Sequence, residues 1–392
     1  MKNIIYLLLF LIGNLVGFGC TSEEGVVFRD SKGGEDQAYK RTVLVYMVES
    51  NLGPYLQKNV SDLTLAATKK NLGSGHLVVF YSKGKDDAEL FEIKDGADGK
   101  PTKHHIRDYE GSAVDNALMA RVISDVKNDY PSDGYGLILS SHGTAWLPRG
   151  YSEMLRSFGE EERNVMEIQS LVEAIPDGSF DFLLFDACSM GTIECIYELK
   201  DKAEYIVSSP SEILVDGFPY AAILPYFFKE KAQMNKVAEG FFTHYMGKPE
   251  GSRYANVSVV DTKELGNLAG AVKEILSGKT EEDWFVLSLE TMQLLSYLPG
   301  APIKLYDFDD IIRAMATDEQ YAQFKIALDK AIPVKYSTLE ILCKGDKTGS
   351  EYYYVTVDVE GFSGLSAYPL HKGRTQLNGW YKTNLSWPKA VF

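Results

Sequence analysis

The sequence has few positive charges for its number of acidic residues. It contains 40 lysines and arginines against 55 aspartates and glutamates, which gives a formal net charge of −15. A protein that binds nucleic acid in general needs a basic face to meet the phosphates. The deficit therefore argues against nucleic acid as a partner, and it is compatible with cationic substrates or partners without identifying them.

The chain lacks an apolar stretch long enough to be a convincing membrane span, since the run from Ile4 to Ile12 is short and N-terminal. A lysine before this run and small residues before Cys20 are typical of a secretory signal. We therefore expect residues 1–19 to be a signal peptide and Cys20 to be the lipidated first residue of a bacterial lipoprotein. A plain secreted or uncleaved form is the alternative.

Residues 20–40 are polar and contain several glycines, so we interpret them as a tether between the lipid and the folded body. These features predict an exported protein that contacts the membrane through its N-terminal lipid. The cell envelope is the expected location, and the acidic "CTSEEG" after the cleavage point resembles the surface-export signals of some Gram-negative lipoproteins.

Cysteine is scarce, with four in the whole chain. Lipidation of Cys20 would leave Cys188, Cys195 and Cys343, an odd number, so at least one thiol stays unpaired within the chain. One interpretation is that all three are small buried apolar residues. The segment "CSMGTIE" after Cys188 lacks the arginine that a cysteine phosphatase loop needs for its phosphate.

Internal repeats are absent, and short β-branched runs alternate instead with segments of helical periodicity. This alternation predicts an α/β fold with a mainly parallel β-sheet flanked by helices. The expected strands are 42–48, 76–82, 135–141, 180–186, 204–209 and 254–260.

The pattern changes after about residue 262. We expect helices over 265–277 and near 308–331, and then paired strands over 352–359 and 364–370. The predicted organisation is a catalytic domain over 41–264 and a smaller C-terminal α+β subdomain over 265–392, packed on it.

Two of the expected strands end in residues suited to chemistry. "LILSSHG" ends with His142 and Gly143, and "FLLFDACSMG" brings Cys188 to the end of its strand. If the strands are parallel neighbours, the imidazole and the thiol meet at one edge of the sheet and form the minimal pair for nucleophilic acyl transfer. The backbone amides of Gly143 and Cys188 are candidates for stabilising an oxyanion. The helical pattern that follows predicts a helix N-terminus near Cys188, which would favour the thiolate.

Three motifs in order, "SHGTAW", "DACSM" and "DGFPY", resemble the clostripain family within the caspase-like cysteine peptidases of clan CD. The resemblance implies a caspase-like fold, a catalytic dyad of His142 and Cys188, and cleavage after arginine or lysine. Asp186 and Asp216 match the positions that bind the basic side chain of the substrate in such proteins, where a carboxylate suits a guanidinium or ammonium group. The alternatives are a strand-end acid bonded to nearby backbone for Asp186 and a turn residue for Asp216.

Members of this family often cut themselves between the two dyad strands, and the corresponding region here is the polar segment 147–164. Arg156 is the expected cleavage site and Arg149 the second choice. An ordinary surface loop with solvated arginines is the alternative.

The chemistry of a cysteine dyad requires no cofactor. His104 and His105 have no third ligand at metal spacing, so no metal site is assigned to them. The acidic run at 305–310 is a candidate for calcium, which some relatives need, although helix N-capping is the more common role of such a run.

The sequence as a whole predicts a cysteine endopeptidase that acts on protein or peptide substrates with arginine or lysine before the cut. Two alternatives remain open. One is a surface-anchored binding or adhesion protein on the same scaffold without turnover. The other is a cysteine acyltransferase or amidase that uses the same dyad.

Overall fold

The computed structural model describes residues 39–96, 98–148, 157–161, 164–298, 303–344 and 352–392. The predicted signal peptide, Cys20 and almost all of the tether lie outside these residues, as do Arg149 and Arg156. Residues 37–392 form one compact unit, and the description below concerns that unit.

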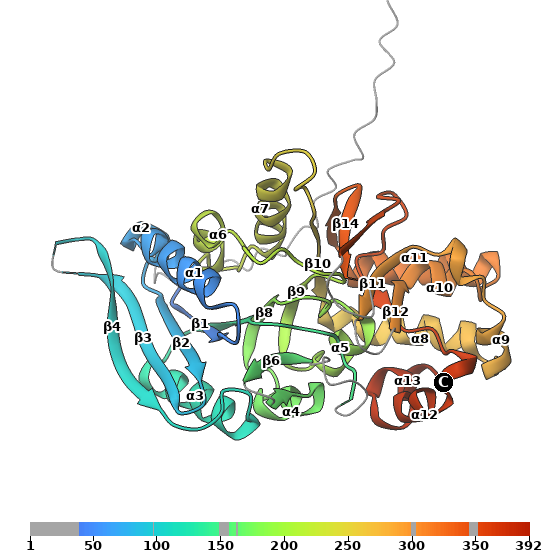
Figure 1. Ribbon diagram of the computed structural model, residues 1–392, viewed down its shortest axis with the longest axis horizontal. Helices are drawn as coiled ribbons and strands as arrows, with labels where there is room; N and C mark the ends of the chain where they lie inside the picture. The colour runs from blue at the N-terminus through green and yellow to red at the C-terminus, as the bar shows by residue number, and fades with distance from the viewer. Residues whose placement is uncertain (1–38, 97, 149–156, 162–163, 299–302, 345–351) are drawn as a thin grey trace, which may run out of the picture. The chain divides into compact units, whose positions relative to one another are not determined.

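A nine-stranded mixed sheet, in the order β13-β10-β9-β8-β5-β1-β2-β3-β4, organises the described residues (Figure 1). The strands β9, β8, β5, β1 and β2 are parallel neighbours, and antiparallel strands extend the sheet on both sides. The bounds are β1 Arg41–Val48, β2 His76–Gly84, β3 Asp87–Asp95, β4 Pro101–Tyr109, β5 Gly134–Ser140, β8 Phe180–Asp186, β9 Ala203–Ser208, β10 Asn256–Asp261 and β13 Val334–Ser337. The predicted α/β class with a mainly parallel sheet is confirmed.

Helices cover both faces of this sheet because alternate strand residues point to opposite sides. In β1, Val43, Val45 and Met47 pack in one core cluster, whereas Leu44 and Tyr46 pack in the other. The first cluster includes residues of α1 Gly53–Ala66, α2 Lys69–Leu72, α6 Tyr220–Phe227 and α7 Met234–Met246. The second includes α3 Asn116–Asp129, α4 Ile168–Ala174 and α5 Ile193–Glu198, and Figure 1 shows the two sets on opposite faces.

The C-terminal helices follow β10, and most of them extend the second cluster. They are η1 Thr262–Glu264, α8 Leu265–Leu276, α9 Glu281–Phe285, η2 Leu289–Thr291, α10 Phe308–Arg313, α11 Asp318–Ala331, η3 Lys372–Arg374, α12 Thr375–Asn384 and α13 Ser386–Val391. The smaller sheets are β11 Leu294–Leu298 with β12 Ile303–Asp307 and β16 Ser366–Ala367, β14 Glu340–Lys344 with β15 Tyr352–Thr356, and β6 Phe158–Glu161 with β7 Asn164–Met166.

Two local predictions in this region were wrong. The segments 352–359 and 364–370 do not pair with each other, because β15 pairs with β14 and the short β16 pairs with β12. The helix expected near 308–331 is two helices, α10 and α11, because Thr317 caps a new helix by accepting a hydrogen bond from the backbone N–H of Gln320.

Candidate active site

The two predicted dyad residues follow strands that are parallel neighbours. Register pairs Ser140 at the end of β5 with Asp186 at the end of β8, so His142 and Cys188 both lie just beyond the same edge of the sheet. A Cβ placed on Gly143 would lie 2.5 Å from the backbone carbonyl oxygen of Cys188. Only glycine fits at this position, and its small size lets the loops that carry His142 and Cys188 touch.

The loop that carries Cys188 is held by neighbouring backbone. The backbone N–H of Ile213 lies 3.4 Å from the Cys188 sulfur, and the N–H of Ser189 donates to the carbonyl of Ser211 at 2.8 Å. Ser189 has a positive φ of 56°, a conformation that is uncommon outside glycine and often marks a functional turn. Cys188 as a residue is half-buried, so part of it reaches the surface.

The helix after Cys188 begins later than its sequence pattern indicates. Thr192 is the N-cap of α5, whose first residue is Ile193, so residues 189–192 separate the thiol from the helix. An N-terminal helix dipole acts within about the first turn. The predicted helix N-terminus next to the sulfur is therefore displaced, and a local loop surrounds the thiol instead.

The other two described cysteines are buried. Burial raises the pKa of the Cys195 thiol well above its ordinary value, and it raises the pKa of Cys343 to about 12. Neither forms a disulfide. A neutral buried thiol is a poor nucleophile, so among the described cysteines only Cys188 is both accessible and next to a histidine loop.

His142 contacts a residue that the sequence analysis did not identify. Its ring nitrogen Nε2 lies 2.6 Å from the side-chain oxygen Oδ1 of Asn51. The backbone carbonyl of His142 accepts a hydrogen bond from the N–H of Gly159 at 2.9 Å, and Gly143 forms an antiparallel bridge with Phe158. The sequence did offer a signal for Asn51. It is a polar residue just after the first buried strand, and that strand ends at the same edge of the sheet as the strand before His142.

Asp186 lies beneath the site and is almost fully buried, with 4% exposure. Its carboxylate accepts hydrogen bonds from the hydroxyl of Ser140 at 3.1 Å, the hydroxyl of Tyr220 at 2.8 Å and the backbone N–H of Phe218 at 3.2 Å. Burial raises the pKa of Asp186 to about 6, although these hydrogen bonds oppose the shift. The carboxylate also lies against Gly217, where a Cβ would be 2.6 Å from its oxygen, so Asp186 holds the turn that follows Asp216.

Asp216 is far more accessible, with a side chain 39% exposed, and its oxygen lies 3.4 Å from the Lys248 amine. Next to Asp216 in the chain, Gly217 accepts a hydrogen bond at its carbonyl from the hydroxyl of Tyr245 at 2.7 Å. The pKa of Tyr245 is raised by burial first and then by the charges of Asp186, Asp216 and Cys188. The turn at Gly217 is thus held by two buried residues, Asp186 and Tyr245.

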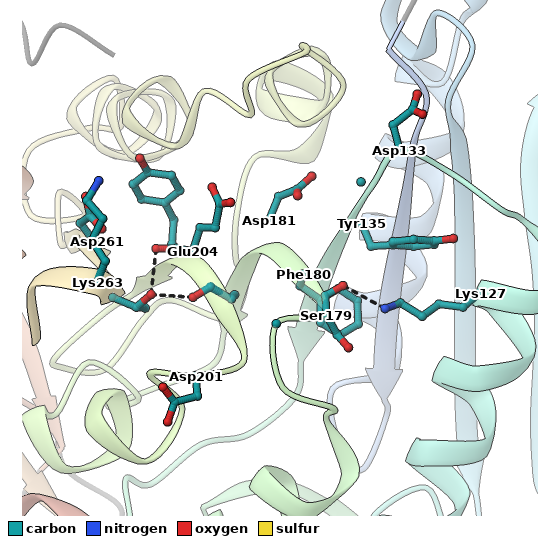
Figure 2. Close-up of a pocket in the computed structure, with 15 residues that line it drawn as sticks. Lys127, Asp133, Tyr135, Ser179, Phe180, Asp181, Asp201, Glu204, Asp261 and Lys263 are labelled. Atoms are coloured by element: carbon teal, nitrogen blue, oxygen red, sulfur yellow. Dashed lines mark hydrogen bonds and ion pairs between the residues drawn. The ribbon is translucent and has the colours of Figure 1, made fainter. Parts of the chain in front are cut away.

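A cavity of about 680 Å³ lies at the opposite edge of the sheet, where β5, β8 and β9 begin (Figure 2). Two of its acids already have cationic partners, since Asp181 pairs with Arg41 at 2.7 Å and Asp261 pairs with Lys263 at 2.9 Å. The Lys127 amine donates to the carbonyl of Ser179 at 3.0 Å. The size of this cavity therefore does not indicate the reactive site.

Within the described ranges, no group of three histidine, cysteine, aspartate or glutamate side chains is placed to hold a metal ion. His104 and His105 lie on β4. In the acidic run 305–310, the carboxylate of Asp307 accepts from the backbone N–H of Asp309 at 2.9 Å and caps α10. Helix capping thus occurs there, and calcium binding by this run stays a hypothesis.

Comparison with known proteins shows the family to which the chain belongs. A model of the clostripain family matches residues 45–359. The X-ray structure of an inactive zymogen C11 protease from Parabacteroides distasonis superposes with a TM-score of 0.79 at 34% identity, over 90% of this chain and 98% of that one. A secreted C11 cysteine protease from Bacteroides thetaiotaomicron, in complex with an irreversible peptide inhibitor, gives 0.78 at 25% identity over the same shares.

Clostripain from Hathewaya histolytica is 25% identical over 226 residues, which is 49% of this chain and 43% of clostripain. The present chain therefore matches less than half the length of that curated relative. From the family match and the similarity to the zymogen structure together, the chain belongs to the clostripain family. In the part of the chain that the structure covers, no helix has the length and apolar character to cross a bilayer.

Proposed function

We propose that this protein is a cysteine endopeptidase that cuts after arginine or lysine with Cys188 as nucleophile and His142 as general acid and base. The observation that carries the proposal is the contact of the two catalytic loops at Gly143, which brings the thiol and the imidazole to one edge of the sheet. Cys188 is half-buried whereas Cys195 and Cys343 are buried, and this difference favours turnover over passive binding because a thiolate must be reached by substrate to react.

In the proposed reaction, His142 takes the thiol proton and the sulfur of Cys188 attacks the scissile carbonyl carbon. The backbone amides of Gly143 and Cys188 stabilise the oxyanion that forms. Collapse of this intermediate breaks the C–N bond, and the leaving amine takes the proton from His142. Water then attacks the thioester, gives a proton to His142 and releases the acid and the thiolate.

Asp216 is the proposed contact for the basic side chain of the substrate, because its carboxylate is accessible and already attracts an amine of the protein itself. Asp186 is proposed to support this site from below through the turn at Gly217, and to add negative charge when ionised. The similar secreted C11 cysteine protease from Bacteroides thetaiotaomicron binds an irreversible peptide inhibitor, which is in keeping with peptide substrates here.

Self-cleavage after Arg156, with Arg149 as second choice, is proposed as the activating step. The described residues Ser157 to Glu161 follow this arginine directly in the sequence. Among them, Gly159 donates its N–H to the carbonyl of His142 and Phe158 forms a bridge with Gly143. Cys188→Ala protein that splits at the same place as wild type would exclude self-cleavage and point to a contaminating protease.

The experiment that tests the function uses purified wild type and Cys188→Ala on fluorogenic peptides that differ only in the residue before the cut. We expect cleavage after arginine and lysine by wild type and none by the variant. Transfer to an added amine in place of water would favour the acyltransferase alternative. No turnover even after tryptic cutting within 147–164 would favour a binding protein. Repeating the assay with EDTA tests calcium dependence.

Lipid attachment at Cys20, export and envelope anchoring are proposed from the N-terminal sequence alone. Membrane fractionation of wild type and Cys20→Ser tests them. We expect wild type in the membrane fraction and the variant out of it, and equal distribution would remove the anchor.

A further inference from the structure

Three adjacent strands of the sheet, β8, β5 and β1, end beside one another in the order that a catalytic relay needs. They carry Cys188, His142 and Asn51 just beyond their ends. The two loops on the β1 side are tied together, because the hydroxyl of Ser141 donates to the carbonyl of Val48 at 2.8 Å. Nucleophile, base and a third polar group therefore lie in sequence across the carboxyl edge.

We propose that Asn51 is the positioning residue of His142, which rests on the peptidase function proposed above. The oxygen Oδ1 of Asn51 lies 2.6 Å from Nε2, and an amide oxygen can only accept a hydrogen bond. The proton of the neutral imidazole is thereby held on Nε2. The other nitrogen, Nδ1, then keeps its lone pair for the thiol proton of Cys188, and the ring keeps its orientation when it becomes an imidazolium.

The turn that presents Asn51 is built for one conformation. Ser50 has a positive φ of 47°, which costs on the order of 1 kcal/mol or more outside glycine and persists only where the surroundings enforce it. The hydroxyl of Ser50 donates to Glu160 at 3.0 Å, and the N–H of Leu52 donates to the carbonyl of Glu49 at 2.8 Å.

The side chain of Glu49, just before this turn, is also held in place. The hydroxyl of Tyr81 donates to the Glu49 carboxylate at 2.7 Å, and a Cβ at Gly53 would lie 2.2 Å from that carboxylate. The turn is therefore strained, and it is anchored at two places. Such a turn can hold the side chain of Asn51 in one position against the imidazole of His142, as orienting a general base requires.

The first test compares wild type, Asn51→Ala and Asn51→Asp, after the fluorogenic assay has established cleavage by wild type. We expect Asn51→Ala to lose about 10- to 100-fold in kcat with KM nearly unchanged, as part of the 10²- to 10⁴-fold that a general acid and base supplies. Asn51→Asp keeps an acceptor in place and should recover part of the loss. Asn71→Ala is the matched control, because that asparagine lies on α2 and its side-chain amide donates to the nearby carbonyl of Ala66, so its loss should leave kcat unchanged.

The second test does not depend on activity. Nitrogen-15 NMR of the histidine rings in full-length Cys188→Ala protein, with the His142 signals assigned by His142→Gln, reports which ring nitrogen carries the proton. We expect Nε2–H in the presence of Asn51 and a mixture of tautomers in the Asn51→Ala, Cys188→Ala protein. Unchanged tautomers, or an Asn51→Ala enzyme with wild-type kcat, would overturn the role of Asn51 while leaving the peptidase function intact. Absence of cleavage by wild type would instead overturn the peptidase function, and the NMR result would still decide about Asn51.

Discussion

At the scale of single residues, two acids of the same type have different environments. Asp186 is buried, bonded to Ser140 and Tyr220, and its pKa is raised to about 6, whereas Asp216 is 39% exposed. A buried carboxylate with three donors is suited to holding a loop, and an accessible one is suited to meeting a ligand. The structure therefore separates two acids that the sequence treats alike.

Asp216→Asn should lower kcat/KM for arginine substrates by about 10- to 100-fold, because a hydrogen bond to a charged group is worth about 1.5–3 kcal/mol. Steady-state kinetics on the arginine peptide measures this loss. Alkylation of Cys188 by iodoacetamide is the control and should keep its wild-type rate. A parallel loss of alkylation would indicate misfolding rather than a specificity role.

Lys248 competes for the same carboxylate, since its amine lies 3.4 Å from Asp216. Lys248→Met should raise kcat/KM for basic substrates up to about fivefold, because an exposed ion pair is worth about 0.2–1 kcal/mol. Lys236→Met, which removes an exposed lysine on α7 that pairs with Glu239, is the matched control and should have no effect. An unchanged Lys248→Met enzyme would mean that substrate does not displace this pair.

At the scale of elements, a buried acid joins α5 to the C-terminal part of the chain. Glu194 is fully buried, and its carboxylate accepts from the backbone N–H of Tyr368 at 2.9 Å and from the hydroxyl of Tyr381 at 3.2 Å. Burial raises the pKa of Glu194 to about 7. The helix α5, which follows the loop of Cys188, is thus joined to the C-terminal residues by an acid with a raised pKa.

The raised pKa makes the stability depend on pH with a definite sign. The folded state keeps the proton of Glu194 more tightly than the unfolded chain, so its contribution is complete below the ordinary pKa of 4.5 and is lost as pH rises through about 7. Glu194→Gln should therefore gain stability relative to wild type between pH 5 and pH 8, by on the order of 1–3 kcal/mol. Thermal unfolding of both proteins across this range measures the change, and parallel pH profiles would contradict it.

At the scale of the whole chain, the segment 147–164 divides the sequence without dividing the fold. The strand β5 lies before it and β8 after it, and they are hydrogen-bonded neighbours from Gly136 to Ser140 and from Phe182 to Asp186. Both sides of the segment also contribute to the two core clusters. A cut there breaks one bond of the backbone and none of these contacts.

Cleavage within 147–164 by limited trypsin should therefore give two fragments on a denaturing gel and a single particle of unchanged size on gel filtration. The fragments should separate only with denaturant, because they share the sheet and its cores. Elution of two smaller species in native buffer would contradict this expectation. Cys188→Ala protein, which should not cut itself, is the suitable starting material.

Local pattern in the sequence was sufficient for the expected strands of the sheet core, for the helix at Leu265–Leu276 and for the strand ends that carry His142 and Cys188. Apolar periodicity reports which residues are buried, and a strand followed by a small or polar residue reports where the backbone leaves the sheet. These features depend on neighbours within a few residues, so they can be recognised without any tertiary information.

The tertiary structure decided what depends on residues far apart in the sequence. In the tertiary structure, β15 pairs with β14, and β13 lies at the edge of the main sheet. Asp186 is buried under the turn at Gly217, and Asn51 contacts a histidine 91 residues later in the chain. No local periodicity carries such pairings, because they are set by which strands lie side by side and by the space between them. The sequence by itself determined the class of fold and the strand ends that carry the proposed reacting groups, and the packing of distant segments decided how those groups are held.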